Sequence, residues 1–131
     1  MTDATTHSGG APLLVVEDLA THFAIDAGLV RAVDGVSFEL YPGQTLGIVG
    51  ESGSGKTVLA RTIMRLNLGE NVRTSGNVRF SNQSLLDLPI SDMKQIWGRE
   101  IAMVFQDPMT SLNPVVKIGR QVTEHVRKHF G

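Results

Sequence analysis

The chain has 131 residues, of which 41% are hydrophobic and 19% charged, a composition that suits one globular domain. Its net charge of −1 gives no basic field for nucleic acid, and a sequence without cysteine excludes disulfides and thiolate metal sites. No apolar run approaches the roughly 20 residues that span a bilayer. The polar residues 1–11 are predicted to form a disordered leader, and residues 12–131 the ordered domain.

Hydrophobic periodicity predicts five strands. The first begins at residues 13–16, and residues 31–40 alternate apolar with polar side chains, the period of a half-buried strand. Residues 45–49 are almost continuously apolar, as in a strand of a parallel sheet covered on both faces. Further strands are predicted at residues 77–80 and 101–105, the latter buried.

Between these strands, a helix is predicted from about residue 56 to 68. Leu59, Ile63 and Leu66 fall at i, i+4 and i+7, which gives the helix an apolar stripe that faces the core. Arg61 and Arg65 are also one turn apart and are expected to form an exposed face.

Two more helices are predicted in the second half of the chain. Ser91 is expected to cap a short helix whose core face holds Met93, Ile96 and Trp97. In the second helix, about residues 116–130, one face carries an apolar stripe made of Ile118, Val122 and Val126. Because the sequence contains no later segment that could cover this stripe, the chain is interpreted as truncated. The parallel sheet predicted for it would then be incomplete.

A glycine-rich loop between the strand at 45–49 and the helix from 56 matches the pattern G-x-x-x-x-G-K-[ST]. Its residues are Gly50, Glu51, Ser52, Gly53, Ser54, Gly55, Lys56 and Thr57. Backbone N–H groups of such a turn and the positive end of the helix converge on phosphates. Lys56 adds a point charge for the β- and γ-phosphates, and Thr57 offers a hydroxyl to Mg²⁺, which prefers oxygen ligands. The competing interpretation is a chance glycine turn before an ordinary helix.

Three stretches resemble the ATPases of ABC transporters. They are the loop itself with Val49, residues 32–38 followed by 42–45, and residues 103–114, which are similar to the glutamine loop of that family. The sequence of residues 105–114 resembles that of the ATPases of dipeptide/oligopeptide and nickel importers in particular. The resemblance implies an α/β P-loop NTPase, specifically an ABC-type nucleotide-binding domain cut after the glutamine loop and the start of the helical subdomain.

The same resemblance implies roles for two residues outside the loop. Gln106 would ligate Mg²⁺ or its water, for which an amide oxygen is suited; alone, it would read as a polar residue at a strand end. Phe23 would stack on adenine through its flat ring face, against the alternative of a core or loop phenylalanine. The implied cofactors are ATP and Mg²⁺.

The resemblance also implies partners and a location. The complete protein would be an energy-coupling subunit that hydrolyses ATP in a homo- or heterodimer with a second ATP-binding subunit. Transmembrane permease subunits would dock between Gln106 and Arg120, which places the protein in the cytoplasm, peripheral on the inner face of the plasma membrane. No nucleic acid is implied.

Three motifs of this family are absent from the 131 residues: an LSGGQ-like signature, an apolar strand ending in Asp-Glu, and a switch histidine. Without an oriented water and extra charge on the γ-phosphate, hydrolysis is not accelerated. The chain alone therefore contains no catalytic residue, and we expect no turnover from it.

Three alternatives stay open at this stage. One is a soluble ABC-type ATPase that acts on DNA or ribosomes, another is a small-molecule kinase with the same loop, and the third is a natural non-catalytic nucleotide-binding fragment. His125 and His129, four residues apart on the last helix, form a possible metal pair. Because no carboxylate or cysteine visibly completes it, a solvated helix face is the preferred interpretation.

Overall fold

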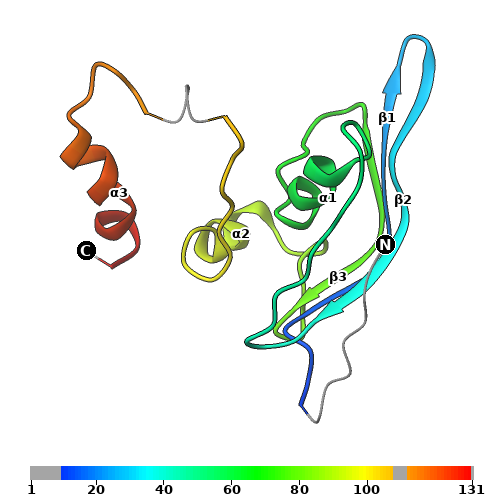
Figure 1. Cartoon of the computed structure of the whole chain (residues 1–131), viewed down its shortest axis with the longest axis horizontal. Helices are drawn as coiled ribbons and strands as arrows, with labels where there is room; N and C mark the ends of the chain where they lie inside the picture. Colours follow the sequence, from blue (N-terminus) through cyan, green and yellow to red (C-terminus); the bar gives the residue numbers. More distant parts are fainter. Residues whose placement is uncertain (1–9, 108–111, 131) are drawn as a thin grey trace. The chain divides into compact units, whose positions relative to one another are not determined.

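The computed structural model describes residues 10–107 and 112–130 (Figure 1). The chain divides into two compact units, Met1–Leu88 and Pro89–Gly131. Most of the predicted leader, and residues 108–111 within the predicted glutamine loop, lie outside the described residues.

The first unit is built on an antiparallel sheet of four strands in the order β2-β1-β3-β4. Its strands are β1 (Leu14–Ile25), β2 (Gly28–Leu40), β3 (Val72–Phe80) and β4 (Gln83–Ser84). A two-residue turn joins β1 and β2 into a long hairpin (Figure 1). β1 pairs on one side with β2 and on the other with β3.

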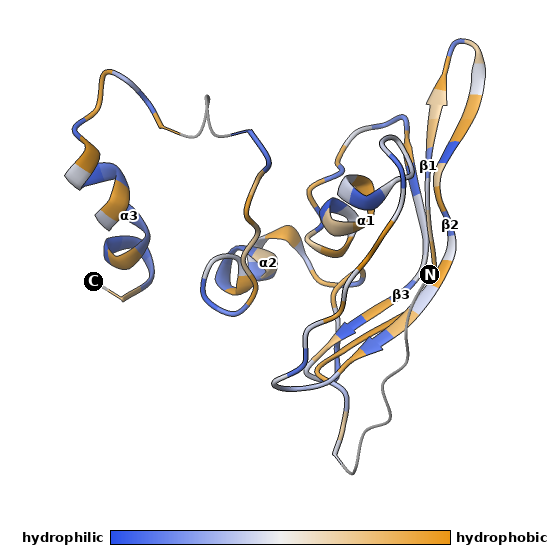
Figure 2. Ribbon diagram, in the orientation of Figure 1, coloured by the Kyte–Doolittle hydropathy of each residue, from blue (hydrophilic) through white to orange (hydrophobic). Residues whose placement is uncertain are grey.

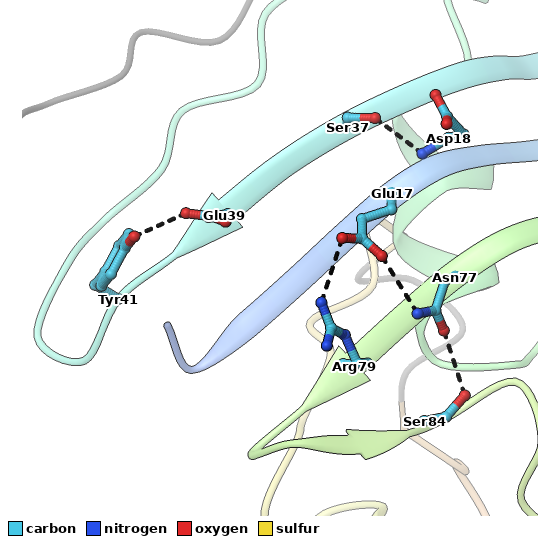
Figure 3. Close-up of polar contacts among 8 residues, drawn as sticks. All are labelled: Glu17, Asp18, Ser37, Glu39, Tyr41, Asn77, Arg79 and Ser84. Atoms are coloured by element: carbon cyan, nitrogen blue, oxygen red, sulfur yellow. Dashed lines mark hydrogen bonds and ion pairs between the residues drawn. The ribbon is translucent and has the colours of Figure 1, made fainter. Parts of the chain in front are cut away.

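A bulge explains why the sequence predicts only the start of β1. The register of β1 shifts after Val16, and Asp18 has a positive φ of 47°. The Asp18 N–H therefore turns toward β2 and donates to Ser37 Oγ at 2.8 Å (Figure 3). Across the bulge stands Gly76 with φ 96°, where a Cβ would collide with the Glu17 and Asp18 carbonyls. The bulge interrupts the alternation of apolar and polar residues, and this alternation is the pattern that identifies a strand in the sequence.

The polar side of the sheet carries a short chain of side-chain contacts (Figure 3). Arg79 Nη2 donates to Glu17 Oε1 at 3.3 Å, and Asn77 Nδ2 reaches Glu17 Oε2 at 3.4 Å. Ser84 Oγ links Asn77 Oδ1 at 3.4 Å with Asp87 Oδ2 at 2.8 Å. These contacts connect β1, β3 and the residues that follow β4.

Helix α1 (Lys56–Ile63) packs against β1 and β2. The core of the unit consists of buried apolar side chains: Val15, Val16, Leu19, Ala20, Val33, Leu59, Met64, Val78 and Leu85. The predicted extension of the helix to residue 68 is wrong, because Arg65 adopts a left-handed φ of 55°. Its guanidinium bonds the Leu85 and Leu88 carbonyls, so Arg65 is held in a loop contact and not on an exposed helix face.

Two of the predicted strands are not formed. Residues 45–49 belong to none of the strands in the described part of the chain, and Val49 is 72% exposed. Residues 101–105 make a single parallel bridge, between Ile101 and Trp97, and Val104 is 95% exposed. A strand requires a hydrogen-bonding neighbour as well as an apolar sequence. Within the described residues, the sheet is antiparallel and gives neither segment such a neighbour.

The second unit contains α2 (Ile90–Ile96) and α3 (Ile118–Phe130). The predicted cap on α2 is wrong, because Pro89 occupies that position and Ser91 lies inside the helix. Met93 and Ile96 are buried as predicted, while Trp97 is half-buried.

Helix α3 has no buried residue, so the predicted stripe of Ile118, Val122 and Val126 is exposed. Figure 2 shows apolar residues interspersed with polar ones along this helix. Neither α3 nor any other helix formed by residues 10–107 and 112–130 has the length and apolarity of a membrane span.

Candidate phosphate-binding site

The predicted glycine loop leads into α1 through two glycines with left-handed backbone conformations. Gly53 has φ 81° and Gly55 has φ 92°, values that side-chain-bearing residues rarely adopt. At Gly55, a Cβ would collide with the carbonyl oxygen of Ala32 on β2. Glycine is required here for both reasons, and its close approach seats the start of α1 directly on the sheet.

The ammonium of Lys56 folds back over this loop. Lys56 Nζ donates to the Gly50 carbonyl at 2.5 Å, to the Glu51 carbonyl at 2.9 Å and to Ser54 Oγ at 3.3 Å. All three acceptors are neutral oxygens, and no carboxylate of the described residues pairs with Lys56. The positive charge is thus positioned at the loop without being neutralised, as binding of an anion requires.

The N-terminus of α1 is open at the same place. Gly55 caps the helix without a side-chain hydrogen bond, and its first turn contains no acidic residue. The first backbone N–H groups of a helix have no intrahelical acceptors and carry the positive end of its dipole. Thr57 lies exposed in this turn. Loop, lysine and helix end therefore combine into one electropositive site.

A buried hydrogen-bond network fixes α1 against the sheet. Thr62 Oγ1 donates to the Val58 carbonyl at 2.7 Å, which uses its only proton. It must then accept from Thr21 Oγ1 on β1 at 2.7 Å and from Asn67 Nδ2 at 2.8 Å. Thr21 and Thr62 are both buried. Because satisfied buried polar groups have few alternative arrangements, this network fixes the direction in which the helix N-terminus points.

A hollow of about 430 Å³ opens beside the loop along β2. Mostly apolar side chains line it, with Arg31, Asp34 and Lys56 as its charged members. The lining is Arg31, Ala32, Val33, Asp34, Val36, Ser37, Phe38, Ile48, Ser54, Gly55, Lys56 and Leu59. No site role was predicted for the β2 residues, because the sequence does not reveal the contact of Gly55 with Ala32 that brings this strand to the loop.

The predicted adenine-stacking residue lies elsewhere on the sheet. Phe23 is half-buried on β1, where its neighbours in register are Val30 and Val72. Those pairings place it near the hairpin end of β1, and it is not part of the hollow's lining. A role for Phe23 in binding adenine stays a prediction.

Gln106, the second predicted metal ligand, is exposed and belongs to the second unit. The structure brings Lys56 together with the other loop residues but leaves the pairing of Gln106 with Thr57 as a prediction. The geometry of the loop itself defines a class: a P-loop protein of α/β type, in which a helix N-terminus and a lysine hold phosphates.

Comparison with known proteins narrows this class. The model of the ABC transporter family matches residues 33–129. A putative peptide import ATP-binding protein of Brucella abortus is 52% identical over 121 residues, which are 92% of this chain and 36% of that protein. The dipeptide transport protein DppD of Lactococcus lactis and the oligopeptide transport protein OppD of Bacillus subtilis are each 48% identical, over 89% of this chain.

The chain belongs to the ABC transporter family, which confirms the resemblance and the fold class predicted from the motifs. It spans about a third of the length of these relatives.

Proposed function

We propose that this chain binds ATP through its P-loop, as part of an ATP-hydrolysing subunit. The observation that carries the proposal is the position of the Lys56 ammonium. It lies among the Gly50, Glu51 and Ser54 oxygens, at the uncapped N-terminus of α1, with no carboxylate partner in the described residues. A triphosphate supplies the anionic oxygens that such a site favours.

Magnesium is the proposed second cofactor. Thr57 would offer its hydroxyl, and Gln106 its amide oxygen or a hydrogen bond to a metal-bound water. Both are oxygen donors, and Mg²⁺ keeps phosphate and water ligands alongside the few that a protein supplies. The exposure of both residues is compatible with this role, since neither is committed to the core.

For the complete protein, the proposed role is energy coupling in an importer of peptides or a related solute. The relatives named for peptide, dipeptide and oligopeptide transport support it. The resemblance of residues 105–114 to the glutamine loop of such importers supports it as well. Its partners would be a second ATP-binding subunit and membrane permeases that dock between Gln106 and Arg120. This arrangement would place the protein at the cytoplasmic face of the membrane.

The 131 residues alone would bind ATP without turning it over. Binding in the ground state does not accelerate hydrolysis, and the sequence shows no Asp-Glu after an apolar strand to orient the water. Phosphate release should therefore stay at background with and without Mg²⁺. Sustained release that disappears in Lys56→Ala would show that a complete site exists in this chain.

Calorimetric titration with ATP tests the binding proposal. Loss of a charged hydrogen-bond partner costs about 1.5–3 kcal/mol, so Lys56→Ala should bind ATP roughly 10- to 150-fold more weakly. Lys94→Ala is the matched control, because it removes an exposed lysine from α2 and should leave the affinity unchanged. Equal affinities of Lys56→Ala and the unmodified chain would overturn the proposal.

A further inference from the structure

The two histidines of α3 have a geometry that the nucleotide site does not explain. His125 and His129 lie one turn apart, and their ring centroids are 4.7 Å from each other with a 50° angle between the planes. Both rings face the turn at Gly98: a Cβ placed there would be 2.7 Å from His125 Cε1, 3.0 Å from His129 Nε2 and 3.1 Å from His125 Nδ1. A nitrogen of each ring thus lies on the side of α3 that faces this turn.

The separation of the rings is the one that a shared metal ion requires. An ion bonded to an imidazole nitrogen at about 2.0–2.1 Å lies roughly 3 Å from the centre of that ring. Two rings on one ion, at bond angles between square and tetrahedral, then have centres roughly 4.5–5 Å apart. The observed 4.7 Å falls inside this range.

We propose that His125 and His129 together bind one divalent transition-metal ion of the class that imidazole favours, such as Zn²⁺, Ni²⁺ or Cu²⁺. Within the described residues, no set of three or more histidine, cysteine or acidic side chains could hold a metal. The site therefore has two protein ligands, and water fills the other positions. Mg²⁺, a hard cation that prefers oxygen, is excluded from it.

The electrostatic surroundings set the conditions for binding. Partial desolvation lowers the pKa of His129, and the charges of His125, Lys128 and Arg99 lower it further. The neutral imidazole is the form that ligates a metal. Lys128 and Arg99 repel the incoming ion, so the site is weaker than a closed site with four protein ligands.

Metal binding has a structural consequence for α3. Because α3 buries no residue, little tertiary packing supports it. An ion held by residues i and i+4 links two consecutive turns and should increase the helix content. Helicity therefore provides a readout that is independent of the heat of binding.

Titration of the 131-residue chain with ZnCl₂ tests the proposal, followed by calorimetry and by circular dichroism. The expected result is saturable binding of one ion with a gain in helicity, no binding of MgCl₂, and at least a tenfold loss of Zn²⁺ affinity in His125→Ala or His129→Ala. His22→Gln should bind like the unmodified chain, since His22 lies on β1, where it pairs with Asp34.

A second variant tests whether binding depends on the spacing of the two histidines or only on their number. Arg127→His combined with His129→Ala keeps the number of imidazoles but sets them two residues apart, where side chains do not face each other. This variant should stay as weak as His129→Ala. The proposal is overturned if it binds Zn²⁺ as the unmodified chain does, if the single variants lose no affinity, or if Zn²⁺ does not bind at all.

Discussion

Two regions of the molecule contain similar apolar residues but bury them to different extents. One is the four-stranded sheet with α1, and the other comprises residues 101–107 and α3. On the sheet, Leu19 and Val78 have no exposed surface, whereas Val104 is 95% exposed and α3 buries nothing. The difference lies in what each segment meets. β1 has a strand on either side and a helix over its face, while α3 has no element of the described residues that covers its apolar stripe.

This contrast shows that burial depends on the partners available and not on hydrophobicity alone. The phosphate loop belongs to the well-packed region, because Gly55 contacts β2 and Thr62 bonds β1. Residues 89–131 would add only Gln106 to the nucleotide site. The contrast therefore predicts different sensitivities to substitution in the two regions.

The largest expected effect is at the centre of the sheet. Leu19→Ala removes a fully buried side chain and leaves a cavity, so it should lower the free energy of unfolding by about 2–5 kcal/mol. Denaturant unfolding measures this loss. A loss below about 0.5 kcal/mol, the size typical of surface substitutions, would mean that this region is no better packed than α3.

Thr62→Val should have the next largest effect. It keeps the shape of the side chain but leaves the buried Thr21 hydroxyl without its acceptor, at a cost of about 1–3 kcal/mol. Asn67 Nδ2 loses one acceptor and keeps the Val58 carbonyl at 3.0 Å. Adding Thr21→Val should cost less than the sum of the two single substitutions, because both remove the same hydrogen bond. Strict additivity of the unfolding free energies would argue against the network.

Gln106→Ala tests the role in nucleotide binding that is expected in the second region. It should leave ATP affinity without metal unchanged and weaken the Mg²⁺ dependence of binding. Loss of one ligand among several is expected to cost about 0.5–1 kcal/mol, or roughly a two- to fivefold shift in a Mg²⁺ titration. Gln95→Ala, an exposed position of α2, is the amide control. An unchanged titration curve would contradict the proposed role of Gln106 as a ligand of Mg²⁺ or of its water.

The smallest effect is expected on α3. Val122 is 65% exposed, so Val122→Ala removes little buried surface and should change the unfolding free energy by no more than about 0.5 kcal/mol. The same denaturant experiment as for Leu19→Ala measures it. A loss near 2 kcal/mol would show that α3 is packed in solution and would remove the contrast between the regions.

The start of α1 and parts of β2 and β3 were predictable because their signals are local. The pattern from Gly50 to Thr57 fixes the helix start at Lys56, where the structure has it. Residues 31–40 and 77–80 fall within β2 and β3 because their alternation continues without interruption.

What could not be predicted depends on tertiary contacts. Helix α1 ends early because Arg65 reaches two distant carbonyls, those of Leu85 and Leu88. The hollow along β2 depends on the approach of Gly55 to Ala32, which no spacing in the sequence encodes. Residues 45–49 and 101–105 have strand-like composition, but composition does not reveal whether a neighbouring strand is present.

The central claim is that the loop recognises phosphate groups, and a comparison of ATP, ADP and AMP tests it most directly. Calorimetry on the unmodified chain, at constant salt and Mg²⁺, should show affinity falling as phosphates are removed. The β- and γ-phosphates are the expected partners of Lys56 and of the first N–H groups of α1, and each lost charged contact costs about 1.5–3 kcal/mol. AMP should therefore bind at least about tenfold more weakly than ATP. AMP binding as tight as that of ATP would contradict the account, because recognition would then rest on the base and sugar.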